Sequence, residues 1–413
     1  MEYGLIGERL GHSFSADIHR ELGGYGYELR EIAREALGGF MENADFKGIN
    51  VTIPYKEAVI PYLHSIDGGA AAIGAVNTVV KRHGKLYGYN TDFMGMKALL
   101  ERIGADPKGK KTLILGTGGT SKTAVAVVKA MGGTEIYRVS RSGAEGAVTY
   151  EQAYSEHSDS ALIINTTPVG MYPKAEGYPI DVSAFTGLKW VADAVYNPLR
   201  TRLVQEAREQ GAVAGGGLYM LVAQAVFASE LFLDRSYAAG TVERIYEKLL
   251  SSKENIVLIG MPASGKSTVG ALLAARLGRA LVDTDALVVE HAGMDIPTIF
   301  EREGEASFRD RETEGVKEAG LMSGAVIATG GGAVLREENV SALKQNGRLY
   351  FLDRPLDMLM PTEDRPLSRS RETLERRYKE RYGIYSSVAD CRIDNSTTAD
   401  AAVEMIEKEF FGR

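Results

Sequence analysis

Residues 260–268, GMPASGKST, have the composition and spacing of a loop that binds nucleotide phosphate. They satisfy the pattern GxxxxGK[ST] with Gly260, Gly265, Lys266 and Ser267. In such a loop the backbone N–H groups surround the β-phosphate at a helix N-terminus, the lysine reaches the β- and γ-phosphate oxygens, and the serine ligates Mg²⁺. A plain glycine-rich turn is the weaker interpretation, because the apolar run NIVLIG precedes the loop and a helical pattern follows it.

Two carboxylates follow this loop in the segment LVDTD. Asp283 and Asp285 stand at positions i and i+2, so in a strand both side chains point the same way at its carboxyl end. One carboxylate can then support Mg²⁺ while the other accepts a proton from a substrate hydroxyl, a division of roles that phosphoryl transfer needs. Taken alone, the pair fits a polar strand end better.

Arginines and glycines downstream indicate an anionic substrate. Arg309 and Glu312 stand one helical turn apart, and Gly330 to Gly332 follow a buried strand, which indicates close approach of a ligand to the backbone. Arginines on the next segment can close over transferring phosphates and exclude water. A solvated helix face is the better interpretation for Arg371, Arg376 and Lys379. The basic residues of this segment are Arg354, Arg365, Arg369, Arg371, Arg376, Arg377, Lys379 and Arg381.

The N-terminal part of the chain carries a second set of polar residues. Ser13 and Ser15 precede a predicted helix and offer two hydroxyls to an anion, although Ser15 is also a good helix N-cap. Pro54 suits a first helical turn, which would place Lys56 near the positive end of a helix and lower the pKa of its ammonium group. Asp92 is expected to stay ionised at the next helix N-terminus and to pair with Lys56. Each residue alone is more often a cap or a surface charge.

A second glycine-rich loop lies in the middle of the chain. Residues 116–121, GTGGTS, approximate the dinucleotide-binding pattern GxGxxG, with Ser121 at the third glycine. The strand EIYRV follows one helix later, and NAD sites place an acidic residue at the end of that strand. Ser140, Arg141 and Ser142 stand there instead and favour the 2′-phosphate of NADP over NAD. An exposed arginine in a turn remains an alternative.

These loops must be positioned by alternating strands and helices. Strand, loop and helix patterns begin at Lys110 and Glu254, and a hairpin with a turn at His83-Gly84 lies upstream. A helix is expected from Pro54, and residues 217–250 are expected to form two amphipathic helices. Residues 251–253 are the expected linker between two halves.

The composition is that of an ordinary soluble globular protein. At about 150 residues per domain, 413 residues indicate two or three domains. A net charge of -7 argues against nucleic acid as a partner, and no segment predicts a membrane span. The single cysteine, Cys391, and six scattered histidines predict a reducing, cytoplasmic location and no structural metal site. Glycine is enriched, with 47 residues, and much of it falls in the loops named above.

The C-terminal motifs resemble those of shikimate kinase. The P-loop, DTD, FRxxE, GGG, EDRPL and RxxxY occur in that order. The resemblance implies a P-loop, nucleoside-monophosphate-kinase-like α/β domain over residues 254–413, and ATP-dependent phosphorylation of the 3-hydroxyl of shikimate with Mg²⁺. Asp285 and Lys266 would be catalytic, and Ser267 and Asp283 would hold the metal. The substrate would be held by Asp285, Arg309, Gly331, Gly332 and Arg381. The nucleotide would be held by Gly260, Ser264, Gly265, Lys266, Ser267, Thr268 and the lid arginine Arg365.

The motifs of the first 225 residues resemble those of shikimate dehydrogenase. They are GxxLxHSxS, NVTxPxK, GAVNT, YNTDxxG, GxGGTS, NTTPVGM, DAVYNPxxT and MLVAQ. The resemblance implies reversible NADPH-dependent reduction of the ketone of 3-dehydroshikimate, with Lys56 as acid/base and Asp92 as its partner. The substrate would be held by Ser13, Ser15, Thr52, Asn77, Asp92 and Gln224. NADP would be held by Gly116, Gly118, Gly119, Thr120, Ser140 and Arg141, with Tyr196 and Gly217 flanking the nicotinamide.

The two resemblances together imply three α/β parts. These are a substrate lobe at 1–105 completed by helices of 217–250, a Rossmann NADP lobe at 106–216, and the kinase domain. The chain is then expected to perform two consecutive steps of aromatic biosynthesis on small-molecule substrates, without a tunnel between the sites. Two alternatives stay open: one domain could be a sensor that binds nucleotide without turnover, or an NAD-type quinate dehydrogenase could be fused to another small-molecule kinase.

Overall fold

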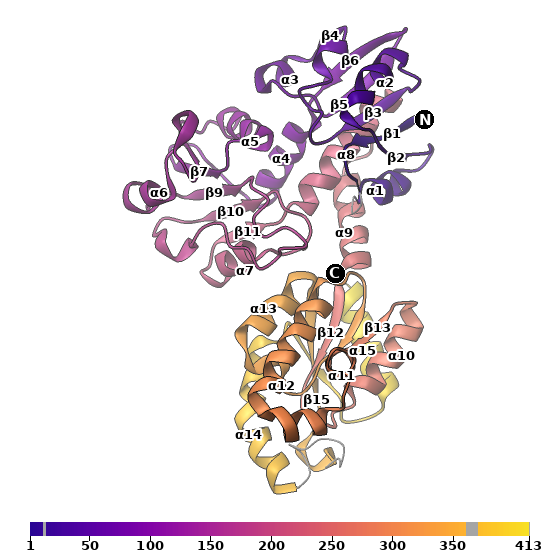
Figure 1. Ribbon diagram of the computed structural model, residues 1–413, viewed down its shortest axis with the longest axis vertical. Coiled ribbons are helices and arrows are strands. Elements are labelled where there is room, and N and C mark those ends of the chain that lie inside the picture. Colours follow the sequence, from indigo (N-terminus) through magenta and orange to yellow (C-terminus); the bar gives the residue numbers. More distant parts are fainter. Residues whose placement is uncertain (11–13, 361–370, 413) are drawn as a thin grey trace. The chain divides into compact units, whose positions relative to one another are not determined.

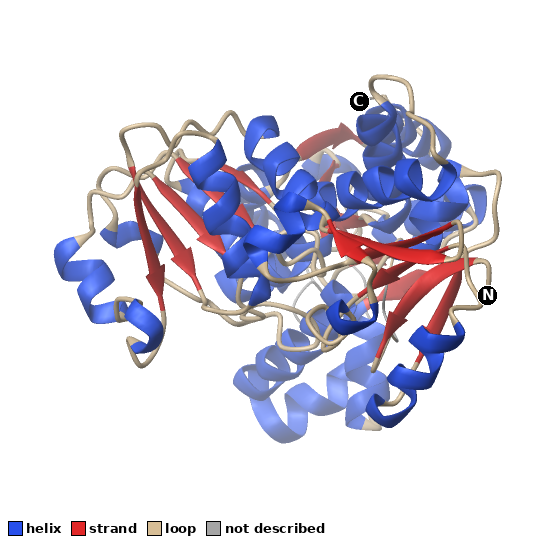
Figure 2. Cartoon of the chain, turned by 90° about the horizontal axis from the view of Figure 1, so that it is seen from above, coloured by secondary structure: helices blue, strands red, loops and turns tan. Residues whose placement is uncertain are grey.

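The structure is a computed structural model that describes residues 1–10, 14–360 and 371–412 (Figure 1). The chain divides into two compact units, Met1–Leu249 and Leu250–Arg413, and each is described by itself. In both, helices pack on the faces of largely parallel sheets (Figure 2). Residues 251–253, expected as the linker, lie next to this division and form the end of helix α9 (Thr241–Lys253). The Glu254 amide closes this helix by donating to the Leu250 carbonyl at 2.8 Å, so the expected linker is helical.

The first unit opens with a mixed six-stranded sheet in the order β2-β1-β3-β5-β6-β4. β1 pairs in parallel with β2 and β3, whereas β5 is antiparallel to β3 and β6. The expected hairpin turn is confirmed, with φ values of 51° at His83 and 75° at Gly84. The strands are β1 (Tyr3–Gly7), β2 (Glu28–Glu31), β3 (Gly48–Val51), β4 (Ser65–Ile66), β5 (Thr78–Arg82) and β6 (Lys85–Tyr89).

Two helices far apart in sequence pack tightly in this lobe. α8 (Leu218–Leu233) lies along α4 (Thr91–Arg102), and Gly95 permits the approach because a Cβ there would lie 2.6 Å from the Met220 carbonyl oxygen. The amphipathic pattern expected of α8 is wrong. This helix is buried around most of its circumference, since it also packs on α1, β3 and β5. The lobe also contains α1 (Ser15–Leu22), α2 (Leu37–Asn43), α3 (Gly68–Ile73) and the short 3-10 turns Arg34–Ala36 and Ile60–Tyr62.

The second lobe of this unit is a parallel five-stranded sheet in the order β11-β10-β9-β7-β8. The strand order reverses at β7, between β8 and β9, and open α/β sheets bind ligands at such a switch point. The glycine loop 116–119 begins there. The elements are β7 (Lys111–Leu115), α5 (Gly119–Ala130), β8 (Glu135–Val139), α6 (Tyr150–Glu156), β9 (Leu162–Asn165), β10 (Trp190–Asp193), α7 (Arg202–Glu209) and β11 (Val213–Gly215), with 3-10 turns at Ala144–Gly146 and Val182–Ala184.

A fully buried carboxylate, Asp193, ties the carboxyl ends of two of these strands together. Its Oδ1 accepts from Asn165 Nδ2 at 2.9 Å and from the Val195 amide at 3.0 Å, and its Oδ2 accepts from Thr201 Oγ1 at 2.6 Å. Burial raises the pKa of Asp193 to about 6, although the three hydrogen bonds oppose this shift. The Asp193 side chain therefore fixes the loop that carries Tyr196. Its burial costs more free energy when the carboxyl group is ionised than when it is protonated.

The second unit contains a parallel five-stranded sheet in the order β13-β14-β12-β15-β16. Alternate residues of the central strand β12 face opposite cores: Ile256 and Leu258 pack with α10 and α15, and Val257 and Ile259 pack with α12, α13 and α14. The strands are β12 (Asn255–Ile259), β13 (Leu281–Asp283), β14 (Val326–Ala328), β15 (Gly347–Asp353) and β16 (Cys391–Asp394). The helices are α10 (Lys266–Leu277), α11 (Thr284–Ala292), α12 (Ile296–Leu321), α13 (Glu337–Asn346), α14 (Arg371–Val388) and α15 (Ala399–Phe411), with 3-10 turns at Ala333–Leu335 and Leu356–Met358.

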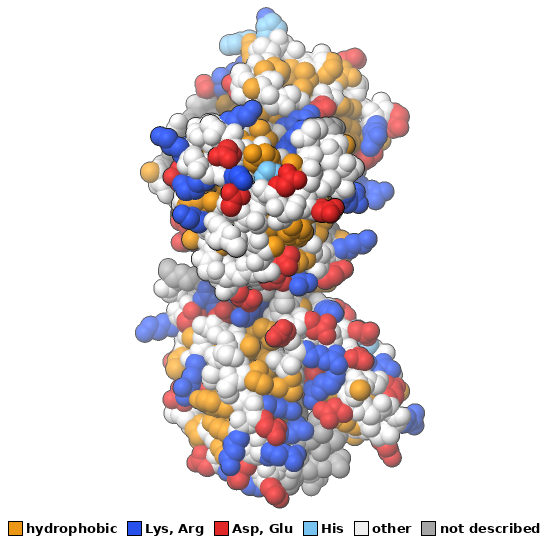
Figure 3. Space-filling view, turned by 90° about the vertical axis from the view of Figure 1, so that its left-hand side faces the viewer, with side chains coloured by type: hydrophobic (Ala, Val, Ile, Leu, Met, Phe, Trp, Pro, Cys, Tyr) orange, Lys and Arg blue, Asp and Glu red, His pale blue; other side chains and the backbone are white. Residues whose placement is uncertain are grey.

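One face of the molecule shows the mixed charge of the sequence (Figure 3). Basic and acidic side chains alternate over the face in Figure 3, and neither sign covers it alone. Among the described helices, none combines the length and the apolar character that crossing a membrane requires.

The raised pKa of Asp193 predicts a pH-dependent contribution to stability. Between about pH 6 and pH 4 the native carboxylate binds a proton more tightly than the unfolded one, so folding gains stability as the pH falls through 6. Relative to the Asp193→Asn variant, which has no charge to lose, the wild-type free energy of unfolding should rise by about 1 kcal/mol from pH 7.5 to pH 5. The measurement is urea denaturation followed by the fluorescence of Trp190, the single tryptophan, which lies on the same strand.

Asp181→Asn is the matched control in this lobe. Hydrogen bonds from Ser183 lower the pKa of the exposed Asp181, so the stability it contributes should instead be lost as the pH falls. A difference between wild type and Asp193→Asn that stays constant with pH would contradict the assignment.

Candidate active sites

A cavity of about 580 Å³ lies in the first unit, between residues of its two lobes. The substrate lobe contributes most of its predicted ligands, and the second lobe contributes part of the predicted nucleotide site. Of the predicted site residues, the cavity is lined by Ser15, Thr52, Lys56, Asn77, Asp92, Thr120, Tyr196, Gly217 and Gln224. Ser13 lies outside the described residues.

Lys56 and Asp92 form an ion pair in this cavity, with Nζ and Oδ2 at 2.5 Å. Asp92 lies in the first turn of α4, as expected, and the Asn90 side chain caps that helix by accepting from the Phe93 amide at 3.3 Å. Lys56 does not lie on a helix, so its expected position in a first helical turn is wrong. The reason is a long-range contact: the Lys56 carbonyl oxygen accepts from the Val76 amide at 2.8 Å, and residues 52–59 form successive turns.

A buried hydrogen-bond network links the substrate residues behind this pair. Asn77 Oδ1 accepts from the Thr91 amide at 2.7 Å, and Asn77 Nδ2 donates to Thr91 Oγ1 at 3.1 Å. Thr91 Oγ1 also lies 3.5 Å from Gln224 Oε1 on α8. Asn50 lines the same cavity and accepts from Tyr27 at 2.7 Å. Thr91 and Asn50 were not predicted as site residues, although both stand inside the quoted motifs YNTD and NVT.

Ser15 is the first residue of α1 and is buried at the cavity. The N-cap interpretation of Ser15 is wrong, because Phe14 occupies that position. Phe14 instead packs against the ring of Tyr196, with ring centroids 5.4 Å apart. The residue that precedes α1 therefore contacts Tyr196, which was expected beside the nicotinamide.

Glycine is required at different positions around the expected nucleotide site for different structural reasons. Gly116 has a φ of 106°, and a Cβ there would lie 3.0 Å from Thr166 Oγ1. Gly118 and Gly119, at the N-terminus of α5, face open space, so a ligand can approach their backbone. Gly217 is needed for packing, since its Cβ would lie 2.3 Å from the Ala194 carbonyl oxygen.

The residues after β8 leave room for a polar ligand group. Ser140 Oγ is shielded from solvent and has no hydrogen-bond partner among the residues that the structure describes, and Arg141 beside it is exposed. An orphaned hydroxyl and an exposed guanidinium next to an open helix N-terminus fit the phosphates of NADP. Thr166 and Thr167, which also line the cavity, were not predicted individually but stand in the quoted motif NTTPVGM.

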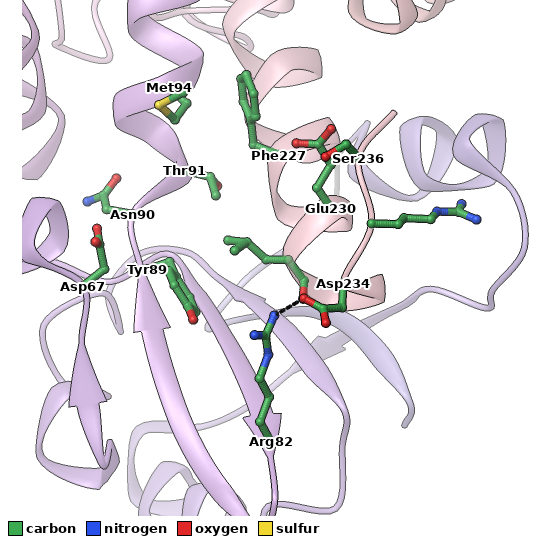
Figure 4. Close-up of a pocket in the computed structure, with 12 residues that line it drawn as sticks. Asp67, Arg82, Tyr89, Asn90, Thr91, Met94, Phe227, Glu230, Asp234 and Ser236 are labelled. Carbon is green, nitrogen blue, oxygen red and sulfur yellow. Dashed lines mark hydrogen bonds and ion pairs between the residues drawn. The ribbon is translucent and has the colours of Figure 1, made fainter. Parts of the chain in front are cut away.

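A second cavity of about 490 Å³ opens on other residues of α4 and α8 (Figure 4). Its wall includes Met94 and Phe227, and Arg82 forms an ion pair with Asp234 at 3.1 Å across it. Of the predicted site residues that the structure describes, none lines this cavity. It shares only Thr91 with the buried network described above.

The phosphate loop of the second unit has the expected position between β12 and α10. Gly260 and Gly265 have φ values of 146° and 88°, conformations that favour glycine. Lys266 is buried, and its Nζ donates to the carbonyl oxygens of Gly260 and Met261, both at 2.9 Å. Ser264 Oγ is buried and finds no partner within the described part of the chain, which fits a loop that receives a further polar group.

Other contacts brace this loop. Asn395, after β16, donates to the Ser264 carbonyl at 2.6 Å and was missed because no motif marked it. Ser267 and Thr268 are exposed in the first turn of α10. Ser267 Oγ lies 3.2 Å from Asp283 Oδ2, so two oxygen donors suited to Mg²⁺ meet here.

The expected strand position of Asp285 is wrong. β13 ends at Asp283, whose Oδ1 caps α11 by accepting from the Asp285 amide at 2.9 Å, so Asp285 lies in the first turn of that helix. Asp285 still faces the glycine loop. A Cβ on Gly330 would lie 2.4 Å from its Oδ1 and 2.9 Å from Glu312 Oε1.

The predicted arginines converge on the same loop from two helices. Arg309 on α12 pairs with the buried Glu312 at 2.7 Å and leaves no room for a Cβ on Gly332, which would lie 2.0 Å from its Nη1. Burial raises the pKa of Glu312, and Arg309 opposes this shift. Arg381 on α14 donates to the Gly331 carbonyl oxygen at 3.0 Å. Arg365 lies outside the described residues.

Both units match known families. The model of the shikimate dehydrogenase substrate binding domain matches residues 5–79. The chain is similar to the shikimate dehydrogenase (NADP(+)) of Clostridium perfringens strain SM101, with 36% identity over 266 residues that cover 60% of this chain and 97% of the relative. Its similarity to the enzyme of the same name from Halothermothrix orenii is 40% over 258 residues, covering 55% and 89%.

Solved structures agree with these relatives. A chorismate mutase/shikimate 5-dehydrogenase fusion protein from Clostridium acetobutylicum has a TM-score of 0.57 at 35% identity, covering 60% of this chain and 96% of that one. Shikimate 5-dehydrogenase from Thermus thermophilus, in complex with NADP(H) and shikimate, has a TM-score of 0.53 at 30% identity, covering 60% and 99%. The model of shikimate kinase matches residues 262–410. The chain therefore belongs to the shikimate dehydrogenase family, and its second unit carries a shikimate kinase domain.

Proposed function

We propose that this chain reduces 3-dehydroshikimate to shikimate with NADPH and then phosphorylates shikimate with ATP. The observation that carries the first activity is the Lys56–Asp92 pair at 2.5 Å, in a cavity that also exposes residues of the nucleotide lobe. The second activity is supported by a phosphate loop, a carboxylate at Asp285 and two arginines around one glycine loop. The product of the first reaction is the substrate of the second.

In the dehydrogenase site, Lys56 is proposed to move a proton at the oxygen of the reacting carbon. Its ammonium group can donate to the carbonyl oxygen as the ketone becomes an alcohol, and it can take the proton back in the reverse reaction. Asp92 would orient the lysine and accept a hydrogen bond from a substrate hydroxyl. Ser15, Thr52, Asn77 and Gln224 line the same cavity and would hold the remaining polar groups of the substrate, as would Ser13.

The nucleotide is proposed to bind along the open backbone of Gly118 and Gly119. Thr120 would contact it from the first turn of α5, and Ser140 and Arg141 would receive the 2′-phosphate of NADP. Gly116 shapes the turn, and Tyr196 and Gly217 would lie beside the nicotinamide. Bound NADPH would supply the hydride.

In the kinase site, charges of opposite sign lie at the two ends of the glycine loop. Asp285 and Gly330 lie at one end, where a substrate hydroxyl would be oriented and deprotonated. Arg309 and Arg381, with Gly332 and Gly331, lie at the other and would bind the substrate carboxylate. A hydroxy acid would thus bind in one orientation, with its hydroxyl directed away from the arginines.

The nucleotide of the kinase is proposed to bind at the phosphate loop. The backbone of this loop would surround the phosphates, and Lys266 would exchange its two carbonyl contacts for phosphate oxygens. Ser267 and Asp283 would hold Mg²⁺, which would neutralise charge on the phosphates, and ATP would supply the phosphoryl group. The loop residues proposed to contact ATP are Gly260, Ser264, Gly265, Lys266, Ser267 and Thr268, together with Arg365.

Replacement of Lys56 should remove the first activity alone. In Lys56→Ala we expect kcat for NADPH oxidation with 3-dehydroshikimate to fall by about 10²- to 10⁴-fold, because the proton donor is lost. Phosphorylation of shikimate by the same preparation should stay normal. Lys85→Ala, which changes an exposed lysine of the hairpin, is the control. Normal NADPH oxidation by Lys56→Ala would refute the assignment.

Replacement of Lys266 should have the opposite pattern. In Lys266→Ala we expect the rate of ADP formation with shikimate and ATP to fall by about 10²-fold or more, because the charge that meets the transferring phosphates is lost. NADPH oxidation should be unaffected. Lys408→Ala, at an exposed position of α15, serves as the matched variant, and equal kinase rates in both variants would exclude this role for Lys266.

Arg141 should determine the preference for NADP. In Arg141→Ala we expect the ratio of kcat/KM for NADPH to that for NADH to fall by roughly 10-fold, because a charge-assisted contact to the 2′-phosphate is lost. The measurement is initial rates with both nucleotides at fixed 3-dehydroshikimate. Lys129→Ala, at the far end of α5, should leave the ratio unchanged. An unchanged ratio in Arg141→Ala would favour the turn interpretation of this arginine.

A further inference from the structure

Arg377 is a mostly buried arginine on α14 without a protein partner among the described residues. It lies on the buried face of the helix with Leu374 and Arg381, and the residue is only 9% exposed. Within the described part of the chain Arg377 makes no hydrogen bond and no ion pair, whereas the neighbouring Arg376 lies 3.9 Å from Glu380. A partly buried cation is more stable when an anion accompanies it. The described residues therefore supply no counter-ion in direct contact with Arg377.

The charges that face Arg377 come from α12 as well as from its own helix. Burial and the charge of Arg381 lower the pKa of Arg377, and Arg309 and Arg376 act in the same direction. Glu305 acts in the opposite direction. Glu305 is already engaged, since it accepts from Arg309 at 3.2 Å. The surroundings of Arg377 are thus dominated by positive charge.

This cluster lies at the arginine end of the glycine loop. Arg381 contacts the Gly331 carbonyl oxygen, and Arg309 lies against Gly332. The charge of Arg309 is largely balanced by the buried Glu312 at 2.7 Å and by Glu305. Arg377 can therefore supply positive potential that Arg309 alone does not.

We propose that Arg377 is a third arginine of the carboxylate-binding subsite in the kinase domain, acting beside Arg309 and Arg381. The ligand class is a small hydroxy acid whose carboxylate enters as the missing counter-ion while its hydroxyl lies toward Asp285. This inference rests on the proposed kinase function. It adds a residue that determines affinity for the charged substrate and takes no part in phosphoryl transfer.

The test compares full-length Arg377→Leu and Arg377→Lys with the wild type and with Arg376→Ala, which changes the exposed arginine next to it. Leucine is chosen because Leu374 occupies the same buried face of the helix. In Arg377→Leu we expect the KM for shikimate to rise roughly 10- to 100-fold, because a charge-assisted hydrogen bond is lost. The kcat and the KM for ATP should stay unchanged. Arg377→Lys should recover part of the affinity, and Arg376→Ala should match the wild type.

Shikimate methyl ester tests whether the substrate charge is what Arg377 binds. Because the ester has no carboxylate, the ratio of kcat/KM between wild type and Arg377→Leu should fall toward one with this substrate. The thermal stability of the second unit should stay equal or increase in Arg377→Leu, since removing this cation relieves its repulsion with Arg381 and Arg309. A purely structural role predicts a loss of stability and equal effects on both substrates.

Two outcomes would overturn this inference alone. One is an active wild type whose KM for shikimate is unaffected by Arg377→Leu, and the other is a rise in the KM for ATP in place of that for shikimate. A wild-type chain that does not phosphorylate shikimate at all would overturn the proposed kinase function, and the inference with it. NADPH oxidation, measured in the same preparations, controls for intact protein in every case.

Discussion

Parallel pairing of strands is the constraint on which both nucleotide sites depend. In such a sheet all carboxyl ends lie at one edge, so short loops after several strands meet in one place. In the first unit, Gly116 follows β7, Ser140 follows β8 and Thr166 follows β9. In the second, the phosphate loop follows β12 and the glycines at 330–332 follow β14. Residues separated by long stretches of sequence thereby become neighbours, and the chain needs few contacts beyond the sheet itself to assemble them.

Close backbone approach is the second theme. Gly330 and Gly332 leave space for the carboxylate of Asp285 and the guanidinium of Arg309, so those two side chains can reach the loop from different helices. Gly95 serves packing instead, where α4 meets α8. The enrichment in glycine therefore has at least two causes, and only one of them concerns ligands.

Short sequence patterns correctly predicted the features that depend only on neighbouring residues. The phosphate loop, the hairpin turn at His83-Gly84 and the position of Asp92 at a helix start all follow from short stretches of sequence. Lys56 could not be placed in this way, because its backbone oxygen is held by an amide far along the chain, at Val76. The helix that carries Asp285 begins at Thr284, where a strand was expected to continue, because the Asp283 side chain caps this helix. The burial of α8 could not be predicted for the same reason. The elements that cover it come from the first part of the chain, and the sequence of the helix itself carries no information about them.

That last arrangement bears on the order in which the chain can fold during synthesis. The substrate lobe begins at β1, yet α8, which packs on α1, β3, β5 and α4, is made only after the whole parallel sheet of the second lobe. The first strands must therefore wait, with part of their apolar surface uncovered, until residue 233 has left the ribosome. By then β7 to β11 are already available to fold as a unit, since each pairs only with strands of its own sheet. The lobe that is encoded first is thus completed second, and the cavity that holds Lys56 can close only when Gln224 arrives.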